Sequence, residues 1–353
     1  MSLPCGTRNF NYNTDMAILR TKTHWVLFAL FLVFLFTLPL YLGNYWLGVA
    51  NLIGITLIAA TGLNILIGYC GQLSIGHAGF IAVGAYTAAI LTNRFELPFL
   101  VGLICAGLTA GFIGLIFGIP SVRVKGFYLA ITTIAAQFII IWVINHWEIT
   151  GGFIGIKVPY ASSWPFGGFV FRTEASQFYL IITIAVLCTF LAKNLARTRV
   201  GRAFIAIRDN DLAAEVMGIN LFYYKLLAFF IGCFLAGISG SLLAHWVGFM
   251  NAEHFTLAES ILYIGMIIIG GLGTTLGPVL GVVFIRLLQQ VLTVQVAPFL
   301  EATFTTLPSG FATGVTPMLF GLVIILFLIL EPRGLAHRWI LFKSAYRLWP
   351  FSY

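Results

Sequence analysis

Charge is what this sequence has least of. Charged residues make up 8% of the 353 residues, and only 11 residues are Asp or Glu. Soluble domains carry about 25% charged residues, so the composition excludes a water-soluble globular protein. Seven runs contain no Asp, Glu, Lys or Arg: 25–93, 97–122, 126–147, 175–192, 226–252, 260–285 and 302–330.

The motifs of several catalytic and metal-binding classes are also missing. No Gly-Lys dipeptide occurs, which excludes the P-loop of an ATP-binding protein. The six histidines show no HxxxH or HxH spacing, the five cysteines form no CxxC, and there is no G-x-S-x-G. We therefore expect no metal, no cofactor and no enzymatic activity on this chain. The net charge of +8 does not indicate a nucleic-acid partner, because cytoplasmic loops of membrane proteins accumulate Lys and Arg.

The apolar runs are long enough for helices that cross a bilayer, each of which needs about 20 residues. We predict an all-α polytopic membrane protein with about ten transmembrane helices. The first, 25–42, is too long for the apolar core of a signal peptide and lacks a small-residue cleavage site after it. The predicted spans are 25–42, 46–68, 78–93, 98–119, 127–146, 177–192, 226–248, 259–273, 278–297 and 315–330. Alternatively, 68–78 and 270–278 are breaks within the membrane.

The distribution of basic residues predicts the orientation. Ten spans place both termini on one side, and that side collects 15 Lys and Arg residues against 3 on the other. Basic residues favour the cytoplasmic side. We therefore expect a cytoplasmic N-terminal segment (1–24), a transmembrane domain (25–336) and a cytoplasmic tail (337–353). Within the transmembrane domain, the loop 148–176 is external and the loop 193–225 is cytoplasmic.

One Gly-rich stretch, "GYCGQLSIGHAGFIAVGAY" (68–86), places polar groups in an apolar region. Irregular backbone at membrane depth is tolerated only inside protein or along a wet cavity. The candidate path residues are Gly71, Gln72, Ser74, Gly76 and His77. The alternatives are close helix packing through glycine, polar bonds between helices, or a tight turn. Arg286 interrupts another span, where it either faces a cavity or extends its side chain to the interface.

The predicted cytoplasmic loop contains a short amphipathic helix. Leu212, Val216 and Met217 have i, i+4, i+5 spacing, which makes an apolar stripe on a helix. Asp209 and Asp211 suit the start of this helix, and Gly218 suits its end. A protein partner is one interpretation, and a helix lying on the bilayer surface is the other. The acidic residues, including Glu215, favour the protein partner, because the cytoplasmic leaflet is negatively charged.

These segments resemble one family, the permease subunits of branched-chain amino acid ABC importers of the leucine/isoleucine/valine type. "GYCGQLSIGHAGFIAVGAYTAAIL" (68–91) looks like the family signature, and "TGGFIGI" (150–156) is similar to its external motif. "GRAFIAIRDNDLAAEVMGINLFYYKLLAF" (201–229), "GGLGTTLGPVLG" (270–281) and "EPRGLA" (331–336) follow in the family's order. The resemblance covers residues from about 50 to 336.

The resemblance implies a subunit of the bacterial inner membrane that pairs with a second homologous permease. Two ATP-binding subunits dock beneath, and an external solute-binding protein delivers the amino acid. It also implies an ATPase-coupling role for the loop, with Gly201, Arg202, Arg208, Asp209, Asp211, Glu215, Met217 and Gly218 as the candidate residues. A permease for urea or another small polar solute is the alternative within the class. An ion-coupled secondary transporter and a membrane-embedded enzyme are the other hypotheses, and the lack of acids in the first six spans argues against ion coupling.

Overall fold

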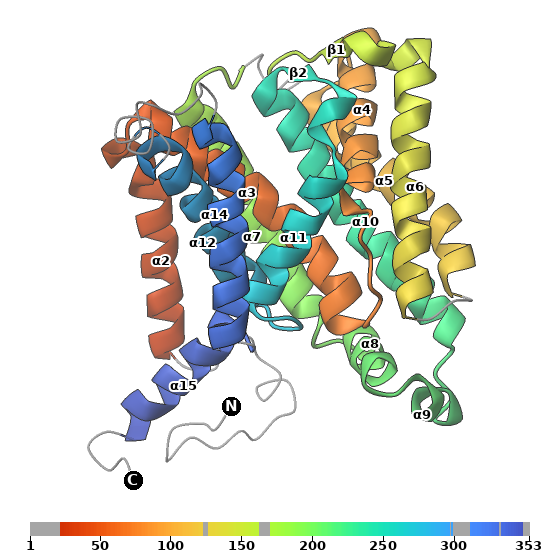
Figure 1. Ribbon diagram of the computed structural model, residues 1–353, viewed down its shortest axis with the longest axis vertical. Helices are drawn as coiled ribbons and strands as arrows, with labels where there is room; N and C mark the ends of the chain where they lie inside the picture. Colours follow the sequence, from red (N-terminus) through yellow and green to blue (C-terminus); the bar gives the residue numbers. More distant parts are fainter. Residues whose placement is uncertain are drawn as a thin grey trace.

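The computed structural model describes residues 22–122, 126–161, 170–296, 298, 311–331 and 333–348. These residues are almost entirely helical (Figure 1). The helices are α2 (Lys22–Tyr41), α3 (Asn44–Leu63), α4 (His77–Arg94), α5 (Phe99–Val122), α6 (Phe127–His146), α7 (Glu174–Leu195), α8 (Arg199–Asp209), α9 (Asp211–Val216), α10 (Leu221–Val247), α11 (Leu257–Gly270), α12 (Leu276–Val291), α14 (Phe311–Leu330) and α15 (Leu335–Leu348). A π-helical turn, η1 (Asn64–Tyr69), continues α3.

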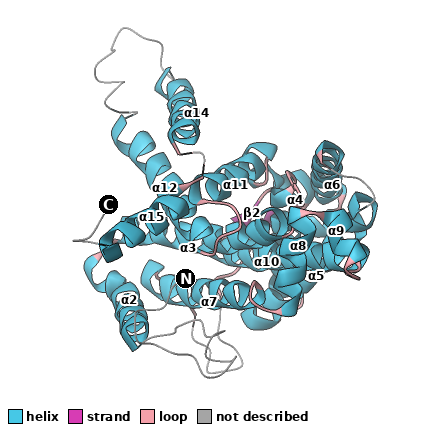
Figure 2. Cartoon of the chain, turned by 90° about the horizontal axis from the view of Figure 1, so that it is seen from below, coloured by secondary structure: helices cyan, strands magenta, loops and turns pink. Residues whose placement is uncertain are grey.

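The two ends of the bundle differ in what they carry. At the upper end in Figure 1, the short strands β1 (Ile156–Lys157) and β2 (Phe249–Met250) pair antiparallel. Helices α8, α9 and α15 lie at the lower end. In the view from below, α8 and α9 lie beside α10 and α5, whereas α2 and α14 are peripheral (Figure 2). The segments predicted to share the cytoplasmic side, 193–225 and the start of the tail, thus lie at one end.

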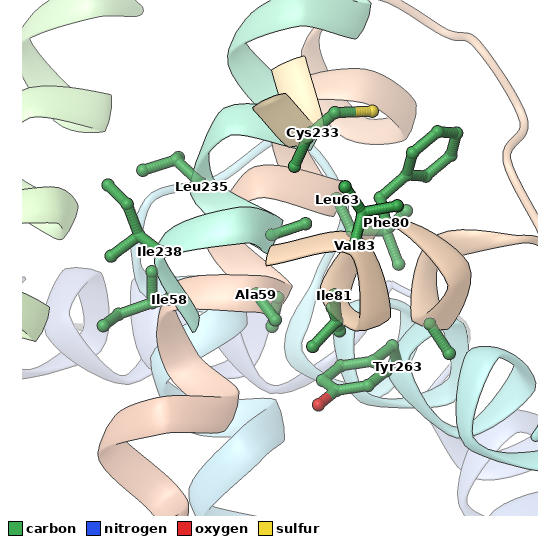
Figure 3. Packing of buried hydrophobic residues seen from close by; sticks show 14 of the residues in the cluster. Ile58, Ala59, Leu63, Phe80, Ile81, Val83, Cys233, Leu235, Ile238 and Tyr263 are labelled. Atoms are coloured by element: carbon green, nitrogen blue, oxygen red, sulfur yellow. The ribbon is translucent and has the colours of Figure 1, made fainter. Parts of the chain in front are cut away.

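Helix α10 is the centre of the bundle and packs against α3, α4 and α5. Glycines allow these backbones to approach closely, as is common between membrane helices. A Cβ at Gly84 of α4 would overlap the backbone of Gly237 in α10, and a Cβ at Gly62 of α3 would overlap the carbonyl of Gly232. Large side chains fill the space between these contacts, and Figure 3 shows Leu63, Phe80 and Ile238 among them.

The outer faces are apolar and exposed. On α6, for example, the side chains of Tyr128, Phe138, Ile139 and Trp142 are all exposed. Seven helices in the described part are long and apolar enough to cross a membrane: Asn44–Tyr69, Phe99–Pro120, Tyr128–His146, Glu174–Leu195, Leu221–Val247, Ala252–Gly270 and Leu276–Gln295. The pair Met318–Leu330 and Leu335–Tyr346, bent by 44°, gives an eighth candidate. The prediction of an all-α polytopic membrane protein is therefore confirmed.

Each of the ten predicted segments overlaps one helix, but not all of these helices meet the length and hydropathy expected of a span. The apolar part of α2, Trp25–Tyr41, is shorter than the spanning helices, and α4 is not among the seven. The number of ten spans therefore stays a prediction. The helices are interrupted at residues 70–76 and 271–275, within the two segments predicted as breaks.

Some predictions fall on residues outside the described part. These are most of the N-terminal segment 1–24, the basic residues Arg123 and Lys125, part of the external loop 148–176 and the end of the tail 337–353.

Candidate functional site

The first break, residues 70–76, lies between η1 and α4. Gly71 turns the chain at its start with φ of +72°, a conformation that side-chain-bearing residues rarely adopt. Space excludes a side chain here too, because a Cβ on Gly71 would lie 2.9 Å from Cγ of Arg208 in α8. The chain then runs without helix until His77, the first residue of α4. The break is therefore in direct contact with the loop that carries α8 and α9.

Helices α6 and α11 satisfy the backbone at the α4 end of the break. The N–H of Ile75 donates to Thr133 Oγ1 at 3.0 Å, and the N–H of Ala78 donates to Ser260 Oγ at 2.9 Å. Ser260 Oγ in turn donates to Gln137 Oε1 at 2.8 Å. The next contact is steric, since a Cβ on Gly76 would overlap the carbonyl of Thr133. This part of the break is a close helix contact, as one of the alternative interpretations expected.

The three polar candidates of the break are all buried, but they are not bonded alike. His77 is fully buried, and its Nε2 lies 3.0 Å from the carbonyl oxygen of Ala59, so Nε2 carries the proton and donates. The Gln72 amide, the Ser74 hydroxyl and His77 Nδ1 have no hydrogen-bond partner among the described residues. An unbonded buried polar group costs about 1–3 kcal/mol. In this arrangement, these three groups are therefore the energetically unfavourable part of the break.

The second break, 271–275, meets η1 through one amide. The Asn64 side chain donates from Nδ2 to the carbonyl of Thr274 at 3.0 Å and accepts at Oδ1 from the N–H of Gly273 at 3.0 Å. Arg208 joins the same place from α8, with Nη1 donating to the carbonyl of Gly68 at 2.8 Å. The structure thus brings together both Gly-rich segments and the predicted coupling loop. We call Asn64, Gly68, Arg208, Gly273 and Thr274 the junction.

Arg286 lies away from the junction, in a network between three helices. Its Nε donates to Thr56 Oγ1 of α3 at 3.2 Å, and its Nη1 donates to Gln289 Oε1 at 3.0 Å. Its Nη2 lies 3.8 Å from a carboxylate oxygen of Glu259 in α11. The Arg286 side chain is only 10% exposed, so it is held between helices.

The predicted coupling loop forms two helices with different roles. In α8, Phe204 and Ile207 are buried against the bundle. A Cβ on Gly201 would overlap the Leu195 carbonyl, so glycine is needed where α8 turns away from α7. The other residues predicted here are exposed or partly exposed: Arg202, Arg208, Asp209, Asp211, Glu215, Met217 and Gly218. Arg208 also donates from Nε and Nη2 to Asp209 Oδ1.

Helix α9 presents an apolar stripe that no part of the described chain covers. Asn210 caps the helix, its side chain accepting from the N–H of Ala213, and Gly218 ends it with φ of +83°. Leu212, Val216 and Met217 are 65%, 87% and 81% exposed. The end and the exposed stripe of this helix agree with the sequence-based predictions, as does its first residue, Asp211, but Asp209 is the last residue of α8 and the capping residue is Asn210.

Sequence reasoning missed the residues that hold the two breaks in place: Asn64, Thr133, Gln137 and Ser260. Asn64 is one of five amide residues in the charge-free run 25–93, so the sequence alone did not single it out. The other three are ordinary polar residues of helices, and only the tertiary contacts distinguish them. No group of three or more His, Cys, Asp or Glu in the described ranges is arranged to hold a metal ion.

Comparison with known proteins gives a consistent family. The family model described as "Branched-chain amino acid transport system / permease component" matches residues 45–329. The chain is 32% identical over 289 residues to the high-affinity branched-chain amino acid transport system permease protein LivM of Escherichia coli, covering 74% of this chain and 68% of the relative. It is 33% identical over 266 residues to LivM of Salmonella typhimurium, covering 69% of this chain and 63% of that relative's length, which is less than two thirds.

A more distant relative is the probable branched-chain amino acid transport permease protein LivM of Methanocaldococcus jannaschii. It is 25% identical over 323 residues, covering 80% of this chain and 90% of the relative. No solved structure matches the chain. The matches extend across both breaks, α8 and α9, so the chain belongs to the family of permease components of branched-chain amino acid transport systems.

Proposed function

We propose that this chain forms half of the translocation path of an ATP-driven importer for branched-chain amino acids. The other half is a second homologous permease subunit, two ATP-binding subunits hydrolyse ATP, and an external solute-binding protein delivers the amino acid. Two observations support the substrate class: the family assignment and the names of the LivM relatives. The complex resides in a bacterial inner membrane, with both termini of this chain in the cytoplasm.

The observation that carries the proposal is the uncovered stripe of α9. An apolar patch of this kind on a membrane protein needs lipid or protein against it. Asp209 and Asp211 are paired with Arg208 and Lys225, and Glu215, in α9 and one residue before Val216, adds an exposed negative charge that disfavours the anionic cytoplasmic leaflet. A groove on an ATP-binding subunit is therefore the occupant, and Gly201 and Gly218 delimit the segment that docks there.

The junction supplies a route from the docked loop to the membrane. Helix α8 is packed on the bundle through Phe204 and Ile207, and Arg208 both bonds the Gly68 carbonyl and lies against Gly71. A displacement of α8 by the ATP-binding subunit therefore acts first on the backbone of the breaks. Gly71, Gln72, Ser74, Gly76 and His77 would form the wall of the path that this displacement opens. Arg286 would act as a fixed positive charge between α3, α11 and α12.

The same proposal includes ten membrane spans, with α2 and α4 crossing the membrane in addition to the eight candidates described above. Helix α4 is preceded by the break at 70–76, and α2 is preceded by residues outside the described part. If both cross the membrane, they bring the number of spans to ten.

The test is to purify the complex after co-expression with its neighbouring transport genes and to change Met217 to Asp. The introduced carboxylate would be desolvated in an apolar groove, and truncation of central interface residues already costs about 2 kcal/mol or more. We expect normal membrane insertion, loss of the ATP-binding subunits during purification, and loss of leucine uptake. Met217→Leu keeps the apolar surface and is the matched control, which should transport normally.

A Met217→Asp complex that keeps its ATP-binding subunits and transports leucine at the normal rate would refute the docking surface. Uptake of urea or short amides in place of leucine, isoleucine and valine would instead identify the alternative solute class.

A further inference from the structure

A pocket of about 370 Å³ lies between the first break and the coupling loop. Its walls come from three places: the start of the break, the start of α6, and the segment from α8 to α10. The lining residues are Cys70, Gly71, Gln72, Gly126, Leu129, Ile207, Arg208, Asp209, Asn210, Asp211 and Lys225. Small-molecule sites in proteins measure about 300–1,000 Å³, so this pocket has room for one small solute.

The charges among the described lining residues are balanced. Arg208 and Lys225 are cationic, and Asp209 and Asp211 are anionic. Lys225 Nζ lies 3.7 Å from Asp211 Oδ2, which is an ion pair but too long for a good hydrogen bond. The hydrogen bonds that Arg208 makes to Gly68 and Asp209 use three of the five N–H donors of its guanidinium. Balanced charges disfavour a polyanion such as a nucleotide and favour a solute that carries both signs.

The remaining walls combine apolar and unbonded polar surface. Leu129, Ile207 and Cys70 present apolar side chains, and all three are buried. Gln72 is 4% exposed, and neither atom of its amide has a partner among the described residues. A buried amide without partners is unfavourable. If the Gln72 side chain turns toward the pocket, a solute with a carboxylate and an ammonium group supplies both missing partners. The carboxylate accepts from the amide N–H, and the ammonium group donates to the amide oxygen.

We propose that this pocket binds a zwitterionic α-amino acid with a branched apolar side chain from the α8–α9 side. The carboxylate is bound by Arg208 and Lys225, the ammonium group by Asp211, and the side chain lies against Leu129 and Ile207. Gly71 and Arg208 both line the pocket and lie against each other. An occupied pocket therefore holds α8 and the break in the present arrangement, and the imported amino acid slows its own further import. This regulatory role rests on the proposed function, which places the α8–α9 end in the cytoplasm.

The first test measures binding to the complete importer complex without its solute-binding protein. Radiolabelled leucine is compared with two analogues as competitors: 3-methylbutylamine, which lacks the carboxylate, and 4-methylpentanoate, which lacks the ammonium group. We expect saturable leucine binding, and each analogue to compete about tenfold less well, equivalent to about 1.4 kcal/mol. Equal competition by either analogue would overturn the zwitterion site, as would the absence of saturable binding.

The second test changes Gln72 to Leu, which has a similar volume and no polar group. If the amide is unbonded in the empty pocket, the variant should melt at a higher temperature than wild type and bind leucine about tenfold more weakly. Ser241→Ala is the matched control, because Ser241 is another buried unbonded polar group, lies in α10 and does not line the pocket. It should leave leucine binding unchanged. Unchanged leucine binding by Gln72→Leu would refute the site.

The third measurement separates this proposal from the proposed function. In proteoliposomes with the α8–α9 end accessible, leucine added on that side should slow ATP-driven transport by wild type and slow it less in Lys225→Gln, because Lys225 lines the pocket and is not part of the proposed path wall. A wild-type complex that transports leucine but is not slowed retains the proposed function and refutes the regulatory pocket. A complex that binds leucine at this pocket but transports none refutes the proposed function alone.

Discussion

Asn64 offers the sharpest perturbation of the junction. Its side chain is 1% exposed and makes two hydrogen bonds to the second break, one to Thr274 and one to Gly273. Leucine has nearly the same shape and can make neither bond. Asn64→Leu therefore removes both bonds and leaves a carbonyl and an N–H without partners, while the packing volume changes little.

The magnitude follows from the two bonds. A neutral hydrogen bond contributes about 0.5–1.5 kcal/mol, and a buried group left unpaired costs more. Gly273 and Thr274 are only half-buried, so water compensates part of the loss. We expect Asn64→Leu to destabilise the protein by about 2–3 kcal/mol. Asn64→Asp keeps the acceptor for Gly273 but loses the donor to Thr274 and places a carboxylate at a site that is 1% exposed, so its effect should be larger.

The assay is thermal unfolding of the complex in detergent, together with leucine transported per ATP hydrolysed. If the junction transmits movement between the breaks, Asn64→Leu should lower this ratio as well as the melting temperature. Thr61→Val is the matched control on the same helix, because the Thr61 hydroxyl bonds only the carbonyl of Leu57 within that helix. An Asn64→Leu complex with wild-type stability and a wild-type ratio would show that the junction is not a mechanical connection.

Two further predictions concern packing and orientation. Gly76→Ala should destabilise the protein by about 1–3 kcal/mol, because the added Cβ overlaps the Thr133 carbonyl. Gly265→Ala in α11, where the described residues leave open space for a Cβ, should stabilise it by about 0.5–1 kcal/mol. Melting temperatures that shift in the same direction for both variants would contradict this packing. In a background without native cysteines, Ile154→Cys should react with a membrane-impermeant maleimide in intact cells and Ser344→Cys only after permeabilisation. Both positions are exposed and belong to opposite ends, so the reverse pattern would invert the predicted topology.

Helix positions were predictable because they depend on local composition. The segment 127–146 was predicted from an uninterrupted apolar run, and α6 has these bounds. The end of α9 was predictable for a similar reason, since Gly218 adopts a left-handed conformation that favours glycine. Length and hydropathy do not decide whether α2 and α4 cross the membrane. Both helices overlap predicted spans, but neither is among the helices that are long and apolar enough to cross.

Contacts between distant segments were not predictable from the same patterns. The sequence shows a faint similarity between 71–84 and 270–281, but not that Asn64 would bond Gly273, which is 209 residues away. Nor does periodicity distinguish the two apolar clusters of the coupling loop. Phe204 and Ile207 are buried by the bundle, whereas Val216 and Met217 are exposed, and only the packing of α8 on the bundle decides between them.

The first break is therefore two structures with different constraints. At its α4 end, Gly76 packs on the backbone of α6 and neighbouring donors are bonded by Thr133 and Ser260. At its η1 end, the backbone N–H groups of Cys70, Gly71 and Gln72 are bonded to carbonyls of η1, whereas the side chains of Gln72 and Ser74 are buried without hydrogen bonds in the described part of the chain. Moving the first part would break satisfied bonds and close packing, whereas moving the second would expose groups that gain partners. If the ATP-binding subunit displaces α8 as proposed, the Gln72 and Ser74 side chains are therefore the part of the break that moves at least cost, whereas Ile75 and Gly76 stay packed against α6.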